Sequence, residues 1–157
     1  HYRTTLNAIP VMFEWMLHPD DWYLLPPAIG AASLHLTTID PNGAASMGFY
    51  LDPAILDLDP YSGDFGIGFW GHGRLAASYF VKQPQHGIMC FFCDVDEVHG
   101  GATGGSDGTQ FTITPRDSMR HKVFLEPLGV LLEVISGSLE SVTVNIDAAA
   151  FTLSLSD

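Results

Sequence analysis

The stretch Ser141-Val-Thr-Val-Asn-Ile146 alternates polar residues with β-branched aliphatic residues at every step. Successive side chains of a β-strand point to opposite faces, so the aliphatic residues share one face and the polar residues share the other. Residues 151–155 (F-T-L-S-L) repeat the same period of two. One buried and one solvated face is typical of antiparallel sheets, so we expect antiparallel strands here.

The chain carries further strand patterns before this stretch, each rich in valine, isoleucine, phenylalanine or threonine. The glycine-rich residues 99–108 predict a loop, and residues 136–138 (S-G-S) predict a tight turn. We therefore expect residues 85–157 to form an antiparallel β-rich, sandwich-like segment. Its other predicted strands cover residues 87–95, 110–114, 122–125 and 130–135.

Residues 1–84 have a helical pattern instead. The first helix should end before Pro19, because the residue that precedes a proline is pushed out of the helical conformation. Asp20 or Asp21 could then cap the next helix by accepting hydrogen bonds from its free amides. A last helix is predicted for residues 64–82.

Helices followed by strands predict an α+β fold with segregated layers rather than a βαβ sheet. The helices are apolar over most of their circumference, as Phe13, Trp15 and Met16 illustrate. Such helices are normally buried among other helices, and the four helices that the pattern predicts within residues 1–84 cannot bury one another that fully. We therefore expect another protein chain to cover these apolar helical faces. The start at His1 rather than at a methionine favours one piece of a longer product.

Composition and charge limit the partners. Of the 157 residues, 46% are hydrophobic and only 15% are charged, against about 25% charged residues in typical soluble domains. Eighteen acidic and six basic residues give a net charge of −12. Such a chain repels phosphates, so we expect neither nucleic acid nor an anionic membrane as a partner. Neutral ligands, cations and a complementary protein surface remain.

Residues 57–74 (D-L-D-P-Y-S-G-D-F-G-I-G-F-W-G-H-G-R) combine aromatic, acidic and basic side chains. Sugar sites use this mixture, because apolar ring faces stack on aromatic side chains and hydroxyls need polar partners. Residues 18–23 (H-P-D-D-W-Y) carry a similar set at a helix boundary. The competing interpretation places the tryptophans in the core and the charged residues at helix ends. The candidate substrate-binding residues are Tyr61, Trp70, His72, Arg74 and Trp22.

Glycoside hydrolysis requires a pair of carboxylates on the two sides of the scissile bond. Asp59 and Asp64 are candidates for such a pair, although their separation does not follow from the sequence, and the catalytic pair stays unassigned. The same region loosely resembles a calcium loop, but Tyr61 occupies a ligand position and the glycine arrives one position late. Capping of a helix by Asp64 explains the pattern better, so no metal is expected and calcium is the alternative. Residues 66–71 fit G-x-G-x-x-G, but no strand precedes them, so no dinucleotide cofactor is expected.

Cys90 and Cys93 lie three residues apart in a predicted strand, where their side chains point to opposite faces. This is poor geometry for a disulfide, so we expect two buried free thiols. A metal site would need a second pair of ligands, and only two histidines lie nearby.

Residues 115–122 (P-R-D-S-M-R-H-K) form a basic cluster in an otherwise acidic chain. We expect an exposed turn between strands, in which Arg116 or Arg120 pairs with Asp117 or Glu126. Docking of an acidic partner surface or of a carboxylated sugar is the alternative.

Three stretches of the chain together resemble one kind of protein. Residues 7–15 (N-A-I-P-V-M-F-E-W), 60–72 (P-Y-S-G-D-F-G-I-G-F-W-G-H) and 114–128 (T-P-R-D-S-M-R-H-K-V-F-L-E-P-L) resemble the C-terminal part of large secreted glycosidase-like proteins. Those proteins are similar to carbohydrate-active enzymes that combine an (α/α) toroid, of the six-hairpin glycosidase kind, with β-sandwich domains.

The resemblance implies that residues 1–84 are the last helical hairpins of such a toroid and that residues 85–157 are a strand-rich region beside it. In a toroid, loops at one end of the helices line the sugar cleft, which would place Tyr61, Asp64 and Trp70 there together with His72. The resemblance also implies a secreted or extracellular protein.

The residues and the resemblance together predict the C-terminal portion, or a subunit, of a carbohydrate-active enzyme. It would be glycoside hydrolase-like and act on neutral oligo- or polysaccharide. The isolated chain is expected to be inactive, because part of the acid–base pair would lie on another chain. The alternative is a non-catalytic structural or assembly protein that inherited a glycosidase-like fold, since fold does not settle function.

Overall fold

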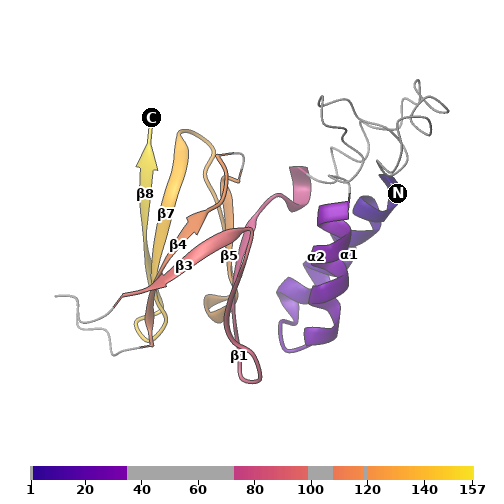
Figure 1. The fold of residues 1–157 in the computed structure, drawn as a ribbon, viewed down its shortest axis with the longest axis horizontal. Coiled ribbons are helices and arrows are strands. Elements are labelled where there is room, and N and C mark those ends of the chain that lie inside the picture. Colours follow the sequence, from indigo (N-terminus) through magenta and orange to yellow (C-terminus); the bar gives the residue numbers. More distant parts are fainter. Residues whose placement is uncertain (1, 35–72, 99–107, 119) are drawn as a thin grey trace. The chain divides into compact units, whose positions relative to one another are not determined.

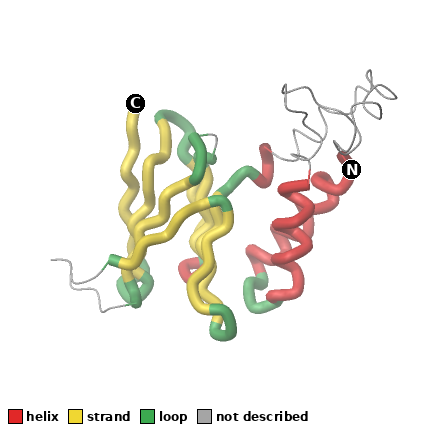
Figure 2. The backbone as a smooth tube through the Cα atoms, in the orientation of Figure 1, coloured by secondary structure: helices red, strands yellow, loops and turns green. Residues whose placement is uncertain are grey.

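The structure is a computed structural model that describes residues 2–34, 73–98, 108–118 and 120–157. The chain divides into two compact units, His1–Leu75 and Ala76–Asp157. The described part of the first unit is helical and the second unit is built of strands (Figures 1 and 2). The predicted α+β class is confirmed. The division lies at residue 75, several residues before the predicted change from helices to strands at residue 84.

The described part of the first unit is a helical hairpin of α1 (Tyr2–Leu17) and α2 (Leu25–Leu34), joined through the 3-10 helix η1 (Trp22–Leu24). Helix α1 ends just before His18-Pro19, as predicted, and it packs against α2. Asp21 precedes η1 but makes no side-chain cap hydrogen bond, so the predicted capping role of Asp21 is wrong. The toroid implied by the resemblance stays a prediction.

The contact between the two helices uses one stripe of each. The buried residues of α1 are Ala8, Met12 and Trp15, which recur at the spacing of four and three that marks one helix face. Those of α2 are Leu25, Ala28 and Ala32. Phe13 and Met16 are half-buried and Leu17 is exposed. No described helix is both long enough and apolar enough to cross a membrane.

The second unit contains two sheets of four strands each. The first has the order β2-β1-β5-β6 and the second the order β3-β4-β7-β8. Neighbouring strands are antiparallel except β1 and β5, which are parallel. The antiparallel pairing expected for residues 85–157 is confirmed for the strand pairs within that range. The strands are β1 (Ser78–Gln83), β2 (Gly87–Phe91), β3 (Cys93–Glu97), β4 (Gln110–Pro115), β5 (Lys122–Leu125), β6 (Val130–Glu133), β7 (Ser138–Asn145) and β8 (Ala150–Ser156).

One apolar core joins the two sheets into a sandwich, because both sheets contribute buried residues to the same cluster. From the first sheet come Phe80, Val123 and Leu125, and from the second sheet come Cys93, Phe111, Ile113, Leu139, Val142 and Val144. The alternation read from residues 141–146 is confirmed: Val142 and Val144 are fully buried, while Ser141, Thr143 and Asn145 stay partly accessible.

Strand β1 corrects the prediction of a helix over residues 64–82. Ser78, Tyr79, Phe80 and Val81 are all buried, so β1 is covered on both faces. Strand β5, its parallel neighbour, is also buried along its whole length. Strands covered on both faces show continuous apolar runs without alternation, which explains why the pattern resembled a helix.

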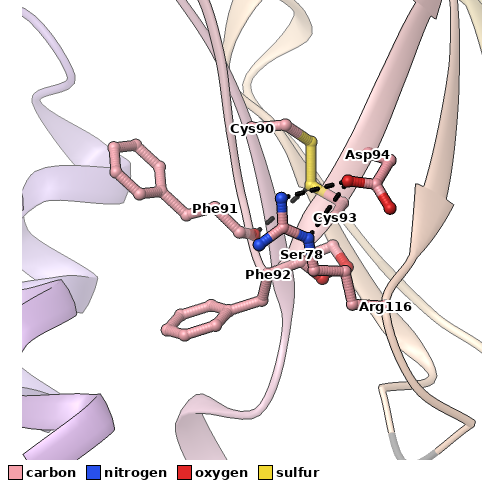
Figure 3. A network of polar contacts seen from close by, with 7 residues as sticks. All are labelled: Ser78, Cys90, Phe91, Phe92, Cys93, Asp94 and Arg116. Atoms are coloured by element: carbon pink, nitrogen blue, oxygen red, sulfur yellow. Dashed lines mark hydrogen bonds and ion pairs between the residues drawn. A yellow bond between two sulfur atoms is a disulfide. The ribbon is translucent and has the colours of Figure 1, made fainter.

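The strand predicted over residues 87–95 is divided at Phe92, and its halves belong to different sheets. Phe92 has a φ of 61°, a left-handed conformation that turns the chain from β2 into β3. A disulfide joins Cys90 to Cys93 across this corner (Figure 3), with the two Cα atoms 5.5 Å apart. The prediction of two free thiols is therefore wrong, because the residues do not lie in one extended strand.

Hydrogen bonds to the Phe92 carbonyl hold the corner in place. The Ser78 hydroxyl donates to this oxygen over 3.3 Å, and the backbone N–H of Arg116 donates over 3.2 Å. The Arg116 side chain donates through Nε and Nη2 to one carboxylate oxygen of Asp94 at 3.1 and 3.0 Å (Figure 3). These contacts tie the start of β1 and the end of β4 to the turn between the sheets.

Candidate functional site

Most of the predicted sugar-site residues lie outside the described residues: Asp59, Tyr61, Asp64, Trp70 and His72. Trp22 is half-buried in η1, and Arg74 is exposed near the end of the first unit. The cleft inferred from the resemblance therefore stays a prediction.

The corner between α1 and α2 contains the second predicted sugar-binding set. Tyr23 is 83% exposed there, while its neighbour Trp22 is half-buried. His18 lies 3.7 Å from the Glu14 carboxylate, and Asp20 is exposed. The corner thus offers one accessible aromatic ring, that of Tyr23.

The outer face of the second sheet presents a more organised set of polar groups. Pairing aligns Gln110 with Asn145 and Thr112 with Thr143 across β4 and β7. It aligns Thr143 with Thr152 and Ser141 with Ser154 across β7 and β8. On β4 and β7 the strand neighbours of these residues are buried in the core, so their side chains point away from it, and pairing with β7 places Thr152 and Ser154 on the same face. We call this surface the hydroxyl-and-amide face; it consists of Gln110, Thr112, Ser141, Thr143, Asn145, Thr152 and Ser154.

A small cavity of about 180 Å³ lies at one end of this face. The cavity wall is more apolar than polar, because Ala148, Ala150 and Phe151 share it with the hydroxyl and amide groups. The lining residues are Gln110, Thr143, Asn145, Ala148, Ala150, Phe151 and Thr152. They come from three strands and from the turn after β7.

Local hydrogen bonds shape the cavity. The Asn145 side-chain oxygen accepts the backbone N–H of Ala148 at 3.0 Å, which closes the turn between β7 and β8. Asparagine favours such turns because its side chain mimics a backbone carbonyl. The hydroxyls of Thr112 and Thr143 lie 3.3 Å apart and share a hydrogen bond. The turn and this cross-strand pair fix the positions of the lining groups before any ligand arrives.

The chemistry of the cavity is that of an uncharged site that combines polar groups with apolar ones. Hydroxyl and amide groups both donate and accept hydrogen bonds, as the hydroxyls of a saccharide do. A volume of 180 Å³ corresponds to about six water molecules, which suits one small ring or the end of a chain. None of the seven residues of the hydroxyl-and-amide face is charged. Carboxylates adjoin the face at both ends: the Ser154 hydroxyl donates to Glu140 at 2.9 Å, and Asp96 of β3 lies opposite Thr112. Binding in the cavity would depend on hydrogen-bond geometry and not on ionic attraction.

The basic cluster at residues 115–122 has a structural role. Arg120 pairs with Asp117, as predicted, whereas Arg116 pairs with Asp94 instead of Asp117 or Glu126. Lys122 lies 3.4 Å from a Glu133 carboxylate oxygen on the neighbouring strand β6. Glu126 accepts the backbone N–H of Lys82 at 3.0 Å. Burial raises the pKa of the Glu126 carboxyl group, and the Lys82 N–H lowers it in part.

Arg120 supports the corner at Phe92. Its guanidinium carbon lies 4.5 Å from the centroid of the Phe92 ring, and that ring meets Tyr79 edge-on with centroids 6.4 Å apart. Arg120 is only 8% exposed, and its Nε atom has no hydrogen-bond partner within the described residues. Burial lowers the pKa of Arg120 and raises the pKa of Tyr79. The stacked cation and the paired carboxylate of Asp117 leave little charge available for a ligand.

Metal binding finds no support in the described ranges. Across residues 2–34, 73–98, 108–118 and 120–157, no group of three or more His, Cys, Asp or Glu side chains could hold a metal ion. The loose calcium pattern around Asp59 and Asp64 lies outside these ranges.

The hydroxyl-and-amide face was not among the predicted sites. The alternation over residues 141–146 predicted which side chains point outward. The sequence also shows that these outward side chains are uncharged, although the chain as a whole has a net charge of −12. The cavity itself depends on pairing between β4 and β7, which are distant in sequence. That pairing carries no local signal.

Comparison with known proteins gave one match. The model of a family of unknown function, DUF5695, matches residues 1–157. No curated protein and no solved structure matched the chain. Since the match spans the whole sequence, the chain belongs to the DUF5695 family.

Proposed function

We propose that this chain is the C-terminal portion or a subunit of a carbohydrate-active, glycoside hydrolase-like protein. In this proposal the hydroxyl-and-amide face binds neutral oligo- or polysaccharide. The observation that carries the proposal is the 180 Å³ cavity, which combines uncharged hydroxyl and amide groups with apolar side chains on an otherwise acidic protein. The resemblance of residues 7–15, 60–72 and 114–128 to secreted glycosidase-like proteins supports the same class of ligand.

Charge favours a neutral ligand. The basic side chains nearest to the second sheet are engaged, because Arg116 pairs with Asp94 and Arg120 pairs with Asp117. A uronic acid or a phosphate would meet a net charge of −12 without a described cation at the cavity. A neutral sugar ring is not repelled by the net negative charge, and its hydroxyls can form hydrogen bonds with the side chains of Gln110, Thr143 and Thr152.

The hydroxyl-and-amide face and the catalytic centre are separate parts of the proposal. Hydrolysis needs one carboxyl group as acid and a second as base or nucleophile. Asp59 and Asp64 remain the candidates, with Tyr61, Trp70 and His72 lining the cleft of a larger toroid. The hydroxyl-and-amide face would hold a neighbouring stretch of the same polysaccharide, as an accessory surface does.

The test measures the affinity of the chain for neutral oligosaccharides. Calorimetry gives the affinity, and an NMR titration shows which residues of the strand unit the ligand contacts. Thr152 is the best site for a substitution, because it lines the cavity, is exposed and lies on the edge strand. Thr152→Val keeps the shape and removes one hydrogen bond, which should weaken binding about 2- to 12-fold, equivalent to roughly 0.5–1.5 kcal/mol. Asn145 is less suitable, because its side chain also closes the turn.

Thr114→Val is the matched control. Thr114 also points outward from β4, but it lies opposite Asp94 and does not line the cavity. Its substitution should leave saccharide affinity unchanged. Equal losses in the two variants, or failure of a broad panel of neutral oligosaccharides to bind, would refute the proposal.

A further inference from the structure

Strand β8 forms an open edge of the second sheet. It pairs with β7 on one side and ends the strand order on the other (Figure 1), so within the described residues its second row of backbone groups meets no strand. All seven residues of Ala150–Ser156 are exposed. Unpaired N–H and C=O groups along an edge are a template for pairing with another strand.

The core-facing side of β8 is also incompletely covered. Pairing aligns Phe151, Leu153 and Leu155 with Val144, Val142 and Leu139, which are buried core residues. Phe151, Leu153 and Leu155 nevertheless remain 40%, 36% and 50% exposed. An apolar ladder beside a free backbone edge marks an interaction surface rather than ordinary scattered exposure.

The opposite edge of the same sheet shows how such an edge is normally protected. Strand β3 carries Asp94, Asp96 and Glu97 in five residues. These carboxylates would repel an identical strand and bind water at the edge. Strand β8, in contrast, contains no charged residue, no proline and no glycine. The charged side chains of β3 therefore disfavour strand addition at that edge, whereas the uncharged edge at β8 allows it.

We propose that β8 pairs with β8 of a second copy of this chain, antiparallel and centred on Leu153. In this register Leu153 faces Leu153 of the second copy, and Phe151 faces Leu155. The apolar residues thus meet on one face, while Thr152 meets Ser154 on the other. The strand is complementary to itself in this arrangement, and the two sheets join into one continuous sheet.

The charge of the chain requires that a contact between two copies be neutral. Each copy carries a net charge of −12, so the two copies repel each other except where the contact is neutral. The β8 strand provides such a contact over seven residues. Salt screens the remaining repulsion, so dimerisation should become stronger as ionic strength rises.

The first experiment measures the oligomeric state of the chain by sedimentation equilibrium over a range of protein and salt concentrations. The wild-type chain should form a dimer that strengthens with salt. Leu153→Lys places two ammonium groups opposite each other and should give a monomer at all concentrations. Leu17→Lys is the matched control, because Leu17 is an exposed leucine of α1 far from β8 in sequence, and it should leave the dimer intact.

The second experiment tests the register by disulfide cross-linking of single-cysteine additions. Residues directly opposite in an antiparallel pair have Cα atoms about 4.5–5.5 Å apart, within the range that a disulfide spans. Leu153→Cys should therefore cross-link with itself under mild oxidation. Phe151→Cys should not, but it should cross-link when mixed with Leu155→Cys. The native cysteines do not interfere, because Cys90 and Cys93 are bonded to each other.

Three results would overturn the proposal. They are a wild-type chain that stays monomeric at all salt concentrations, a dimer that survives Leu153→Lys, or self-linking of Phe151→Cys as efficient as that of Leu153→Cys. The second result would indicate another dimer surface, and the third another register or another occupant of the edge.

Discussion

The turn before β7 offers a sharp test of the fold, because a single methyl group added at Gly137 meets two obstacles. Gly137 has a φ of +81°, a conformation that side-chain-bearing residues rarely adopt. A Cβ atom there would also lie 2.9 Å from the backbone oxygen of Ser156, at the end of β8. Gly137→Ala must therefore both strain the turn and displace the last strand.

The magnitude follows from two controls. Gly129 has a φ of +63°, and a Cβ atom added there would meet no atom within 4 Å, so Gly129→Ala measures the conformational strain alone, about 1–2 kcal/mol. Gly30 lies inside α2 with open space around it, so Gly30→Ala should stabilise its unit by about 0.5–1 kcal/mol. Gly137→Ala adds the cost of the close contact, about 1–3 kcal/mol, for a total of about 2–5 kcal/mol.

Urea unfolding followed by two signals separates the units. The three tryptophans, Trp15, Trp22 and Trp70, all lie in the first unit, so tryptophan fluorescence follows that unit, while the amide NMR signals of the strand residues follow the second. Loss of stability in the strand signal should be largest for Gly137→Ala, intermediate for Gly129→Ala and absent for Gly30→Ala. If Gly137→Ala costs no more than Gly129→Ala, the close approach between the turn and β8 is wrong.

Three further predictions concern the core, one carboxyl group and the disulfide. Ile113→Ala removes a fully buried side chain between the sheets and should cost about 2–5 kcal/mol by circular dichroism, whereas no change would mean that the sheets do not share this core. The raised pKa of Glu126 means that its protonated form favours the folded state, a contribution present at low pH and lost as the pH rises through the raised pKa. Glu126→Gln should therefore become more stable relative to wild type as the pH rises through that pKa, and a difference that is constant with pH would contradict this. Reduction of the bond between Cys90 and Cys93 should add about 2 Da by mass spectrometry and lower the stability of the strand unit by about 2 kcal/mol, while an unchanged mass would refute the disulfide.

The sequence predicted strand boundaries most accurately where a clear turn or loop flanks the strand. Strands β4 and β6 begin at the predicted residues 110 and 130, and in both the local alternation agrees with the alternating burial. Strand β5 begins and ends at the predicted residues 122 and 125, although it is buried throughout. Strand β1 was missed because its Tyr79-Phe80-Val81 run is buried on both faces, and a short continuous apolar run does not distinguish a strand from a buried helix.

The corner at Phe92 could not be predicted from local pattern. A phenylalanine in the left-handed region is unfavourable by itself and occurs only where surrounding contacts impose it. Here those contacts come from residues 14 and 24 positions away, namely the Ser78 hydroxyl and the Arg116 N–H. The disulfide was missed for the same reason, since its geometry exists only because the chain turns at Phe92.

The candidate site shows the same division between local and distant information. The alternation of residues 141–146 predicted that Thr143 and Asn145 point away from the core, which the structure bears out. The cavity beside them needs Gln110 from a strand more than thirty residues earlier, and only the register between β4 and β7 brings it there. A shift of that register by one residue would turn Gln110 into the core and remove the site.

The distribution of charge links the two proposals. The acidic side chains of the second sheet gather on β3, where Asp94 and Asp96 lie opposite Thr114 and Thr112. Across β4, β7 and β8 the paired residues of the same face are neutral up to the open edge, and Glu140 adjoins them only beside Ser154. If a second copy pairs along β8, two neutral faces become continuous, and each cavity lies on one extended surface of hydroxyl and amide groups. A long neutral polysaccharide could then contact both copies at once, so saccharide binding should strengthen dimerisation by the same factor by which dimerisation strengthens binding.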